Sequence, residues 1–329
     1  MDRGSLIKIN GVCKRFGSKL VLDGINLEIK AGELLGIIGA SGTGKTTLLK
    51  TIIGFIEQDS GEVLFNFNSF VKQTASQAQP RPSSFMRKQH RLFNKLFGFA
   101  TQEASFYPKL TVEENLVYFA SLYDLPKKEI AENIGSALEL VNLSKDRHSL
   151  AENLSQGMKK RLDLACSIVH NPKIVLLDEP TADLDPGLRH QIWGLIKKIN
   201  DSGVTVVVAS HFLEELEPLC HRIALLADGK LAAVGSAAEL SHLFAGSELI
   251  KLKSSPGNYN LLCQWLNHYF TDNITHFSAH NGELVIYAKN SSVMLNYIFS
   301  LAKYINEKIS NIEVHKLNPG QISGWRGQL

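Results

Sequence analysis

A short apolar run and the glycine-rich loop after it constrain the fold of this chain more than any other feature. Leu34–Ile38 has the length and composition of a strand that is buried on both faces of a sheet. The next residues, Gly39–Thr46, match the pattern G-x-x-x-x-G-K-[ST], and Thr46–Ile53 is a predicted helix that stops at Gly54. A strand, such a loop and a helix in this order predict a phosphate-binding loop in an α/β fold.

The residue types in this loop suit a polyphosphate. Glycines let the backbone coil so that several N–H groups point at phosphate oxygens, and the helix adds the positive end of its dipole. Lys45 can reach the β- and γ-phosphates, and the Thr46 hydroxyl can ligate Mg²⁺. The alternative is a glycine-rich turn without a ligand, which the flanking strand and helix argue against. The expected nucleotide-binding residues of the loop are Gly39, Ala40, Ser41, Gly42, Thr43, Gly44, Lys45, Thr46 and Thr47.

Two adjacent carboxylates follow a second buried strand. Ile174–Leu177 is apolar, and Asp178 and Glu179 come directly after it, where open α/β sheets bind ligands. We expect Asp178 to hold Mg²⁺, directly or through water, and Glu179 to polarise an attacking water. A carboxylate pair with no chemical role would be a cap or a surface feature, but the phosphate loop in the same chain favours the catalytic interpretation.

Alternating strands and helices in the second half of the chain predict a mainly parallel sheet. Val204–Ala209 and Ile223–Ala227 are further apolar runs of strand length, separated by helical stretches. Nearer the start, Leu6–Asn10 and Leu20–Ile29 are predicted β-structure. Thr111–Glu114 is a T-x-x-E capping box, which predicts the start of a helical region.

One stretch between these elements is basic. No Asp or Glu occurs from Val63 to Gln102, and the predicted insertion, residues 66–97, is rich in Gln, Ser and Pro. A solvated loop is the favoured interpretation, because basic runs usually face water. The alternative is an insertion that contacts lipid headgroups or a partner.

The composition shifts near Ala245–Ser247, and the remaining residues predict a second, smaller domain. Its elements follow the order β-α-β-β-α-β of a ferredoxin-like module, with a hairpin turn at Asn281–Gly282. The predicted strands are 248–253, 274–279, 283–288 and 310–316, and the predicted helices are 257–270 and 292–307. Its role stays open between binding a regulator, dimerising and bracing the rest of the chain.

Charge and apolar content exclude other classes of protein. Lys and Arg exceed Asp and Glu by 35 to 32, which is too little to indicate nucleic-acid binding by charge. No apolar stretch approaches the roughly 18 residues of a membrane span, and the first residues lack the apolar core of a signal peptide. We therefore expect no membrane crossing or export by the chain's own signals. The four cysteines are far apart and are expected to be reduced thiols.

In their order and spacing, these motifs resemble the nucleotide-binding subunits of ATP-binding cassette (ABC) transporters, over roughly residues 6–244. Leu154–Met158 is similar to the family's signature segment, LSGGQ, and departs from it at Gln156 and Met158. The form LSxGM resembles subunits that pair with ABC-2-type exporter permeases. By this resemblance, Ser155 and the N–H of Gly157 meet the γ-phosphate that the opposite subunit holds. A plain helix N-cap at Ser155 is the alternative.

The resemblance also assigns roles to residues outside these motifs. Phe16 matches the position where an aromatic ring stacks on adenine, with a core phenylalanine as the alternative. Gln102 matches the glutamine that senses Mg²⁺ and the attacking water. Ala182–Asp185, and Asp185 in particular, resembles the loop that contacts the partner subunit. His211 matches the histidine that holds the catalytic glutamate and the γ-phosphate. A lone histidine is otherwise more often structural.

The family's architecture gives the expected domains. Residues 1–245 would form an α/β P-loop NTPase cassette with a mainly parallel sheet core, an antiparallel β-subdomain and a helical subdomain at 111–170 that carries the signature. Residues 246–329 would form a C-terminal α+β accessory domain, ferredoxin-like in order. Within the signature helix, Lys159–Arg161 is predicted to be a solvated basic face.

The function that the resemblance implies is hydrolysis of ATP with Mg²⁺, coupled to export. Partners would be a separate integral-membrane permease and a second cassette, in a homodimer or heterodimer. The chain would be cytoplasmic and bound to the inner face of the cell membrane through its permease. The alternatives are a soluble ABC-type ATPase that acts on ribosomes or nucleic acid, a non-hydrolysing ATP-binding module, and a cassette that drives import. No nucleic-acid partner is expected.

Overall fold

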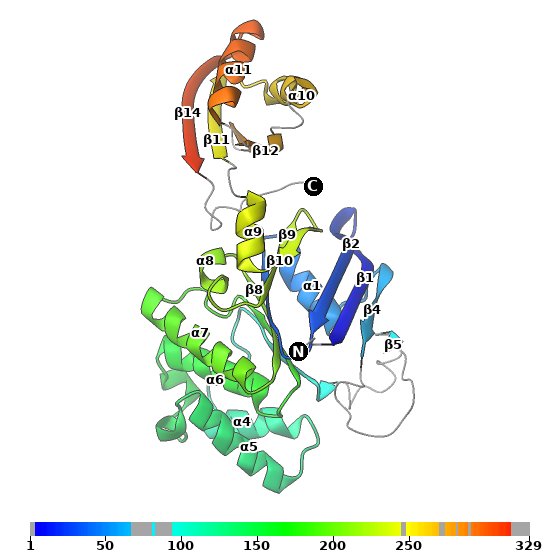
Figure 1. The fold of residues 1–329 in the computed structure, drawn as a ribbon. Coiled ribbons are helices and arrows are strands. Elements are labelled where there is room, and N and C mark those ends of the chain that lie inside the picture. The colour runs from blue at the N-terminus through cyan, green and yellow to red at the C-terminus, as the bar shows by residue number, and fades with distance from the viewer. Residues whose placement is uncertain are drawn as a thin grey trace. The chain divides into compact units, whose positions relative to one another are not determined.

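The computed structural model describes residues 4–66, 81–82, 94–244, 248–269, 274–280, 282–288 and 291–316 (Figure 1). The chain divides into two compact units, Met1–Leu231 and Ala232–Leu329. The domain boundary expected at Ala245–Ser247 lies outside the described residues, as does most of the insertion 66–97. Among the described residues, no helix is both long enough and apolar enough to span a bilayer.

Five parallel strands of a six-stranded sheet form the centre of the first unit. The strands β3, β6, β7, β8 and β9 pair in parallel, as the alternation of strands and helices predicts. Every residue of β3, β7 and β8 is buried, which explains why their sequences are continuous apolar runs. Across the sheet the order is β10 (Lys230–Gly235), β9 (Arg222–Ala227), β3 (Leu34–Ile38), β8 (Thr205–Ser210), β7 (Ile174–Asp178) and β6 (Phe97–Ala100).

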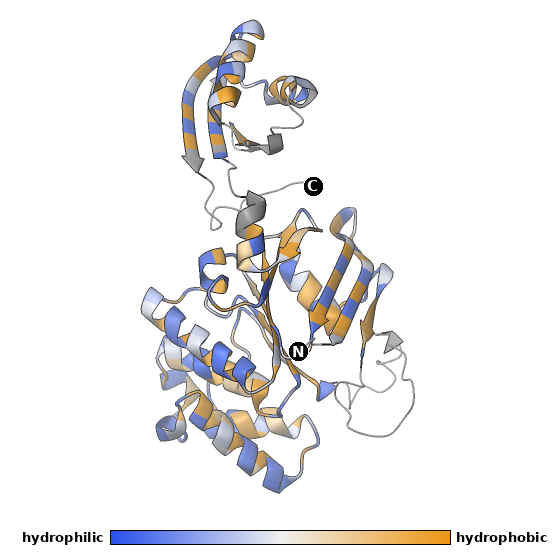
Figure 2. Cartoon of the chain, in the orientation of Figure 1, coloured by the Kyte–Doolittle hydropathy of each residue, from blue (hydrophilic) through white to orange (hydrophobic). Residues whose placement is uncertain are grey.

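A second sheet, antiparallel, packs against this core. Its first two strands, β1 (Ser5–Phe16) and β2 (Lys19–Lys30), confirm and extend the predicted β-structure. Apolar and polar residues alternate along both strands, as Figure 2 shows by its orange and blue bands. The other strands are β4 (Ser60–Phe65) and β5 (Arg81–Pro82). The inward residues of β1, β2 and β4 join those of β3 in one apolar core.

The helices begin where their sequences indicate. Helix α1 starts at Lys45, within the segment Gly39–Thr46 and one residue before the predicted start, and the chain leaves it at Gly54 with a φ of +76°. The capping box is confirmed, since Thr111 Oγ1 accepts from the N–H of Glu114 and the Glu114 carboxylate accepts from the N–H of Thr111. The helices of this unit are α1 (Lys45–Ile52), α4 (Val112–Ser121), α5 (Lys127–Leu140), α6 (Gln156–Ile168), α7 (Pro186–Asp201) and α8 (Leu213–Leu216), with short 3₁₀ turns at Ser144–Asp146 and Ala151–Asn153.

The second unit has the predicted β-α-β-β-α-β order. Its sheet is antiparallel throughout, in the order β12-β13-β11-β14, which is the split β-α-β arrangement of a ferredoxin-like module. One sheet face and both helices enclose an apolar core that includes Leu252, Leu266 and Ile298. Asn281 of the predicted turn lies outside the described residues. The elements are α9 (Ala237–Phe244), β11 (Glu248–Ser255), α10 (Tyr259–Tyr269), β12 (Ile274–His280), β13 (Glu283–Ala288), α11 (Ser291–Tyr304) and β14 (Lys308–Lys316).

Candidate nucleotide site

The glycine-rich loop at the end of β3 has a backbone that only glycine fits. Gly42 and Gly44 have φ values of +80° and +107°, in the left-handed region that other residues rarely adopt. A Cβ on Gly39 would lie 2.4 Å from the carbonyl oxygen of Leu226, and one on Gly44 would lie 2.8 Å from that of Val21. The loop is therefore pressed against two neighbouring strands, which fixes its shape.

Lys45 connects this loop to the carboxylate pair. Its Nζ donates to the carbonyl oxygens of Gly39 at 2.8 Å and Ala40 at 3.3 Å. The same Nζ lies 3.2 Å from Oε1 of Glu179, and the lysine side chain is only 6% exposed. The cation of the loop and the predicted catalytic carboxylate thus form one buried ion pair.

Asp178 and Glu179 have different surroundings. Asp178 is buried at the end of β7, and this burial raises the pKa of its carboxyl, while a hydrogen bond with Thr46 opposes the rise. Within the described part of the chain, Asp178 Oδ1 is buried without a hydrogen-bond partner. An unpartnered buried carboxylate oxygen beside a hydroxyl is a donor set that suits Mg²⁺, which prefers oxygen ligands and few protein contacts. Asp178 and Thr46 therefore fit the metal role predicted for them.

Glu179 is held from two sides in an uncommon backbone conformation. Its φ is +50°, which a residue with a side chain adopts at a cost of about 1–3 kcal/mol. Its N–H donates to the carbonyl of Ala209 on the neighbouring strand β8. Its Oε2 accepts from His211 Nδ1 at 2.8 Å, so that the imidazole and Lys45 hold opposite oxygens of one carboxylate. The structure thus brings Lys45, Glu179 and His211 together.

Gln102 faces the same site. A hollow of about 190 Å³ is lined by the phosphate loop, Gln102 and Glu179, and also by Lys19 and Val21 of β2. The sequence analysis did not predict Lys19 and Val21 as site residues, because they come to the loop from a strand of the antiparallel sheet. Ser155, Gly157 and Asp185 do not line this hollow.

Lys160 is buried, so the prediction of a solvated basic face at Lys159–Arg161 is wrong for this residue. Lys160 is 8% exposed, and its Nζ donates to the backbone carbonyl of Gln102 at 3.2 Å. Burial lowers the pKa of its ammonium group, and the charge of Asp163 opposes this effect. Lys160 follows Gly157 by three residues and precedes Leu164 by four, so the three share one face of α6, and this helical spacing was the signal for its burial.

The signature segment opens helix α6. Ser155 is its N-cap and accepts from the N–H of Met158 at 3.3 Å, so the helix-cap interpretation holds for the hydroxyl in this state. Gly157 packs against helix α7, where an added Cβ would lie 2.7 Å from Leu188 Cδ2. Gln156 is exposed and its Nε2 reaches the carbonyl of Asp183 at 3.5 Å.

Two further predicted residues lie at element ends. Phe16 ends β1 and is 51% exposed, so the alternative of a core phenylalanine is wrong. Lys14 Nζ lies 5.5 Å from the centre of its ring. Asp185 is the N-cap of α7 and accepts from the N–H of Leu188 at 2.9 Å.

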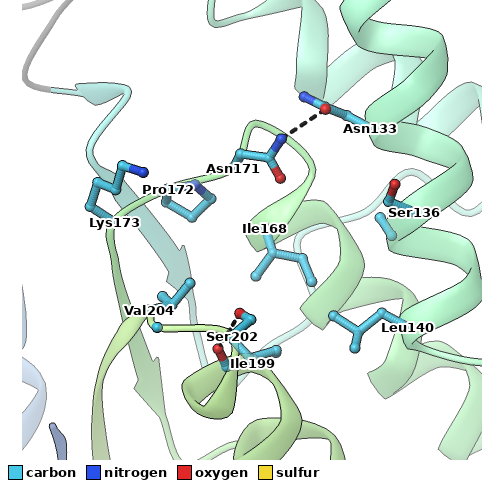
Figure 3. Close-up of a pocket in the computed structure, with 12 residues that line it drawn as sticks. Asn133, Ser136, Leu140, Ile168, Asn171, Pro172, Lys173, Ile199, Ser202 and Val204 are labelled. Carbon is cyan, nitrogen blue, oxygen red and sulfur yellow. Dashed lines mark hydrogen bonds between the residues drawn. The ribbon is translucent and has the colours of Figure 1, made fainter. Parts of the chain in front are cut away.

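A larger hollow lies at the N-terminal ends of strands β7 and β8. Its volume is about 270 Å³, and its walls come from α5, from the C-terminal ends of α6 and α7, and from the residues that precede β7 and β8 (Figure 3). Two of its lining residues are hydrogen-bonded, since Asn171 Nδ2 donates to Asn133 Oδ1 at 2.8 Å. Because the phosphate loop follows the opposite end of a parallel strand, this hollow is separate from the nucleotide site.

Comparisons with known proteins agree with this geometry. The model of the ABC transporter family matches residues 22–182. The linearmycin resistance ATP-binding protein LnrL of Bacillus subtilis (strain 168) is 31% identical over 250 residues, 76% of this chain and 75% of LnrL. The Nod factor export ATP-binding protein I of Burkholderia thailandensis is 33% identical over 246 residues, 75% of this chain and 76% of that protein.

Solved structures show the same fold. The cbiO1 protein of Clostridium perfringens, part of the ABC transporter complex cbiONQ, has a TM-score of 0.64 at 24% identity, over 81% of this chain and 96% of that one. An ATP-binding subunit of an ABC transporter has a TM-score of 0.61 at 23% identity, over 73% of this chain and 94% of that one. Together with the relatives of similar length, these likenesses confirm the expected fold, and the chain belongs to the ATP-binding proteins of ABC transporters and is an ATPase.

Proposed function

We propose that this ATPase powers export through a separate membrane permease, and that two cassettes close on two ATP molecules to do so. The observation that carries the hydrolytic part is Glu179, held between Lys45 at 3.2 Å and His211 at 2.8 Å beside the phosphate loop. Export is supported by the LSxGM form at Leu154–Met158 and by the names of relatives that act in Nod factor export and linearmycin resistance.

The ion pair suggests how ATP prepares its own hydrolysis. The phosphates compete for Lys45 Nζ, and when the ammonium turns to them, Glu179 Oε1 becomes available to a water molecule. His211 keeps the other oxygen fixed, so the carboxylate stays oriented while it polarises that water. Asp178 and Thr46 would hold Mg²⁺, whose charge offsets that of the phosphate oxygens. Positioning and charge neutralisation account for catalysis, because phosphoryl transfer needs little covalent chemistry from the protein.

The second cassette would supply the contacts that one chain lacks. Ser155 and Gly157 lie at the N-terminus of α6, a helix of 13 residues whose dipole favours an anion there. They do not line the hollow of their own phosphate loop, which agrees with a role towards the ATP of a partner. Asp185, at the start of α7, belongs to the same edge. Phe16, exposed at the end of β1, is available to stack on the base.

An apolar hollow next to Gln102 suits the permease. It measures about 430 Å³ and is lined by β6 and its flanking residues, by the segment that follows α1, by helix α6, and by helix α4 and its C-terminal end. Phe55 and Leu122 on its wall are 69% and 59% exposed, far more than apolar side chains of a closed surface. We assign this hollow to a segment of the permease. The chain would then lie at the inner face of the membrane through that partner.

The test is to isolate the tagged chain from detergent-solubilised membranes of its own cells and to measure ATPase activity with and without the partner. We expect an integral-membrane protein to accompany the chain and to stimulate hydrolysis. Phe55→Ser should remove both effects, whereas Val117→Ser, an exposed apolar residue on α4 that does not line the hollow, should not. A chain that leaves the membrane fraction in salt and hydrolyses ATP at the same rate alone would contradict the proposal.

A further inference from the structure

Glu215 connects the segment after Glu179, the segment after His211 and helix α7. Its carboxylate accepts from Thr181 Oγ1 at 2.8 Å, from Trp193 Nε1 at 3.0 Å and from Arg189 Nη1 at 3.1 Å. Thr181 and Trp193 are 2% and 5% exposed, so their donors have little access to water. Thr181 stands two residues after Glu179, and Glu215 itself stands four residues after His211. One carboxylate thus ties helix α7 to the segments that carry both catalytic residues.

Arg189 extends this connection to the loop at Ala182–Asp185. Its Nε donates to the carbonyl oxygen of Leu184 at 2.7 Å, while another edge of the guanidinium binds Glu215. The face of the guanidinium lies 4.8 Å from the ring centre of Phe212. A planar fork can make these three contacts at once, which the single ammonium of a lysine cannot do.

Phe212 completes the path to the catalytic pair. Its ring centre is 3.8 Å from that of His211. The His211 side chain is 42% exposed, so packing on all sides does not fix it. Its orientation depends instead on the Glu179 carboxylate on one side and on Phe212 on the other. A displacement of Arg189 would therefore move the His211 imidazole through the Phe212 ring that lies between them.

We propose that Arg189 and Glu215 are positioning residues for hydrolysis. They hold the Ala182–Asp185 loop and the His211 ring as one unit, so that a displacement of the loop changes how His211 holds Glu179. The inference rests on the proposed roles of Glu179 and His211 and goes beyond them. It names the side chains through which a contact made at the loop controls the catalytic carboxylate.

The experiment compares conservative variants of this path with matched controls. Arg189→Lys keeps the charge but loses the fork, Glu215→Gln removes the carboxylate charge that faces the half-buried Arg189 guanidinium, and Phe212→Leu keeps apolar volume but loses the ring. Each should lower kcat about 10- to 100-fold, because a small displacement of catalytic groups has effects of this size, while KM for ATP and the Kd of nucleotide change less than about twofold. Arg147→Lys, in the Arg147–Glu113 ion pair of the helical region, and Glu214→Gln, an exposed neighbour on α8, should leave kcat unchanged.

A double variant separates a positioning path from a structural brace. Along one path, Arg189→Lys combined with Phe212→Leu should reduce kcat no more than the stronger single change does. Independent, multiplying losses would overturn the path. A lower thermal midpoint with unchanged kcat in Arg189→Lys would show a brace only and would also overturn it. His211→Ala is the reference: if it retains normal turnover, the proposed function fails, whereas loss in His211→Ala with normal Arg189→Lys refutes this inference alone.

Discussion

Glu179 combines a left-handed backbone with a carboxylate that contacts both Lys45 and His211. The first costs conformational energy, and the second offsets part of this cost through Lys45 and His211. Strain of this kind persists only where the surroundings enforce it, and such residues cluster at functional sites. The backbone angle is thus an observation independent of any sequence motif, and it supports a catalytic role for this residue.

Glu179→Gln should therefore lower ATP turnover by roughly 10²–10⁴-fold, the typical size of a lost general base. The amide keeps the shape of the side chain, so nucleotide affinity should stay within about threefold. Steady-state hydrolysis and equilibrium binding of a fluorescent ATP analogue measure the two effects. Turnover close to that of the unmodified chain would remove Glu179 from its proposed role.

Lys45→Ala should act on nucleotide binding instead, because it removes the cation that the phosphates require. We expect tight binding of nucleotide to be lost, measured by the same titration. A variant that kept its affinity would contradict the assignment of the phosphate loop. Lys50→Ala, in the last turn of the same helix, provides the control for general effects on α1.

His170 provides a pH-dependent test of the core. It is buried, its Nε2 lies 2.8 Å from the carbonyl oxygen of Phe97, and its ring stacks on Tyr123 at 3.6 Å. Burial lowers its pKa from 6.5 to about 4. The folded state therefore favours the neutral ring, and its contribution to stability is complete above pH 6.5 and is lost as the pH falls towards 4.

In unfolding experiments between pH 7 and 4, the free energy of unfolding should fall by up to about 1.4 kcal/mol per pH unit from this group. His170→Phe keeps the stacked ring but cannot titrate, so its profile should be flatter by that amount. Parallel profiles for the two proteins would show that His170 is protonated equally in both states.

Among the elements, the glycines of helices α5 and α7 have open space around them, whereas the glycine of strand β6 does not. Gly135 and Gly194 lie on exposed helix faces, and no described atom lies within 4 Å of a Cβ built on either. Gly98 in β6 lies against α6, where a Cβ would come 2.0 Å from the carbonyl oxygen of Ser167. The same substitution should therefore have opposite effects at these sites.

Gly135→Ala and Gly194→Ala should each stabilise the chain by about 0.5–1 kcal/mol, since alanine favours the helix interior. Both should leave ATPase activity unchanged. Gly98→Ala should destabilise the chain, because the backbone of β6 and α6 must separate. Chemical denaturation measures all three, and a stabilising Gly98→Ala would refute the close approach of these elements.

Sequence patterns predicted the elements well where the signal is local. The strand, glycine loop and α1 follow one another in the chain, and the capping box at Thr111 needs only four residues. The order of strands and helices was enough to predict the ferredoxin-like sheet. Side chains that meet from distant segments could not be predicted in this way. The contact of Lys160 with the carbonyl of Gln102 joins residues 58 positions apart.

At the scale of the whole molecule, the proposed pairing of two cassettes through the exposed ends of α6 and α7 predicts that hydrolysis depends on chain concentration. Specific ATPase activity should rise with protein concentration, because dilution separates the two cassettes. A 1:1 mixture with Glu179→Gln chains should have less than half the activity of the unmodified chain, if a mixed pair is impaired as a unit. Activity of one half at every concentration would mean that each copy works independently.

The contact between Gly157 and Leu188 has a consequence for any such pair. Because Gly157 in the first turn of α6 packs against Leu188 in the first turn of α7, and Gln156 Nε2 also reaches the carbonyl of Asp183, we expect the two helix ends to move together. In the pair proposed above, a phosphate group that displaces Ser155 would therefore also displace Asp185. Docking at this rim would then be all or none, and half-engaged assemblies would be scarce.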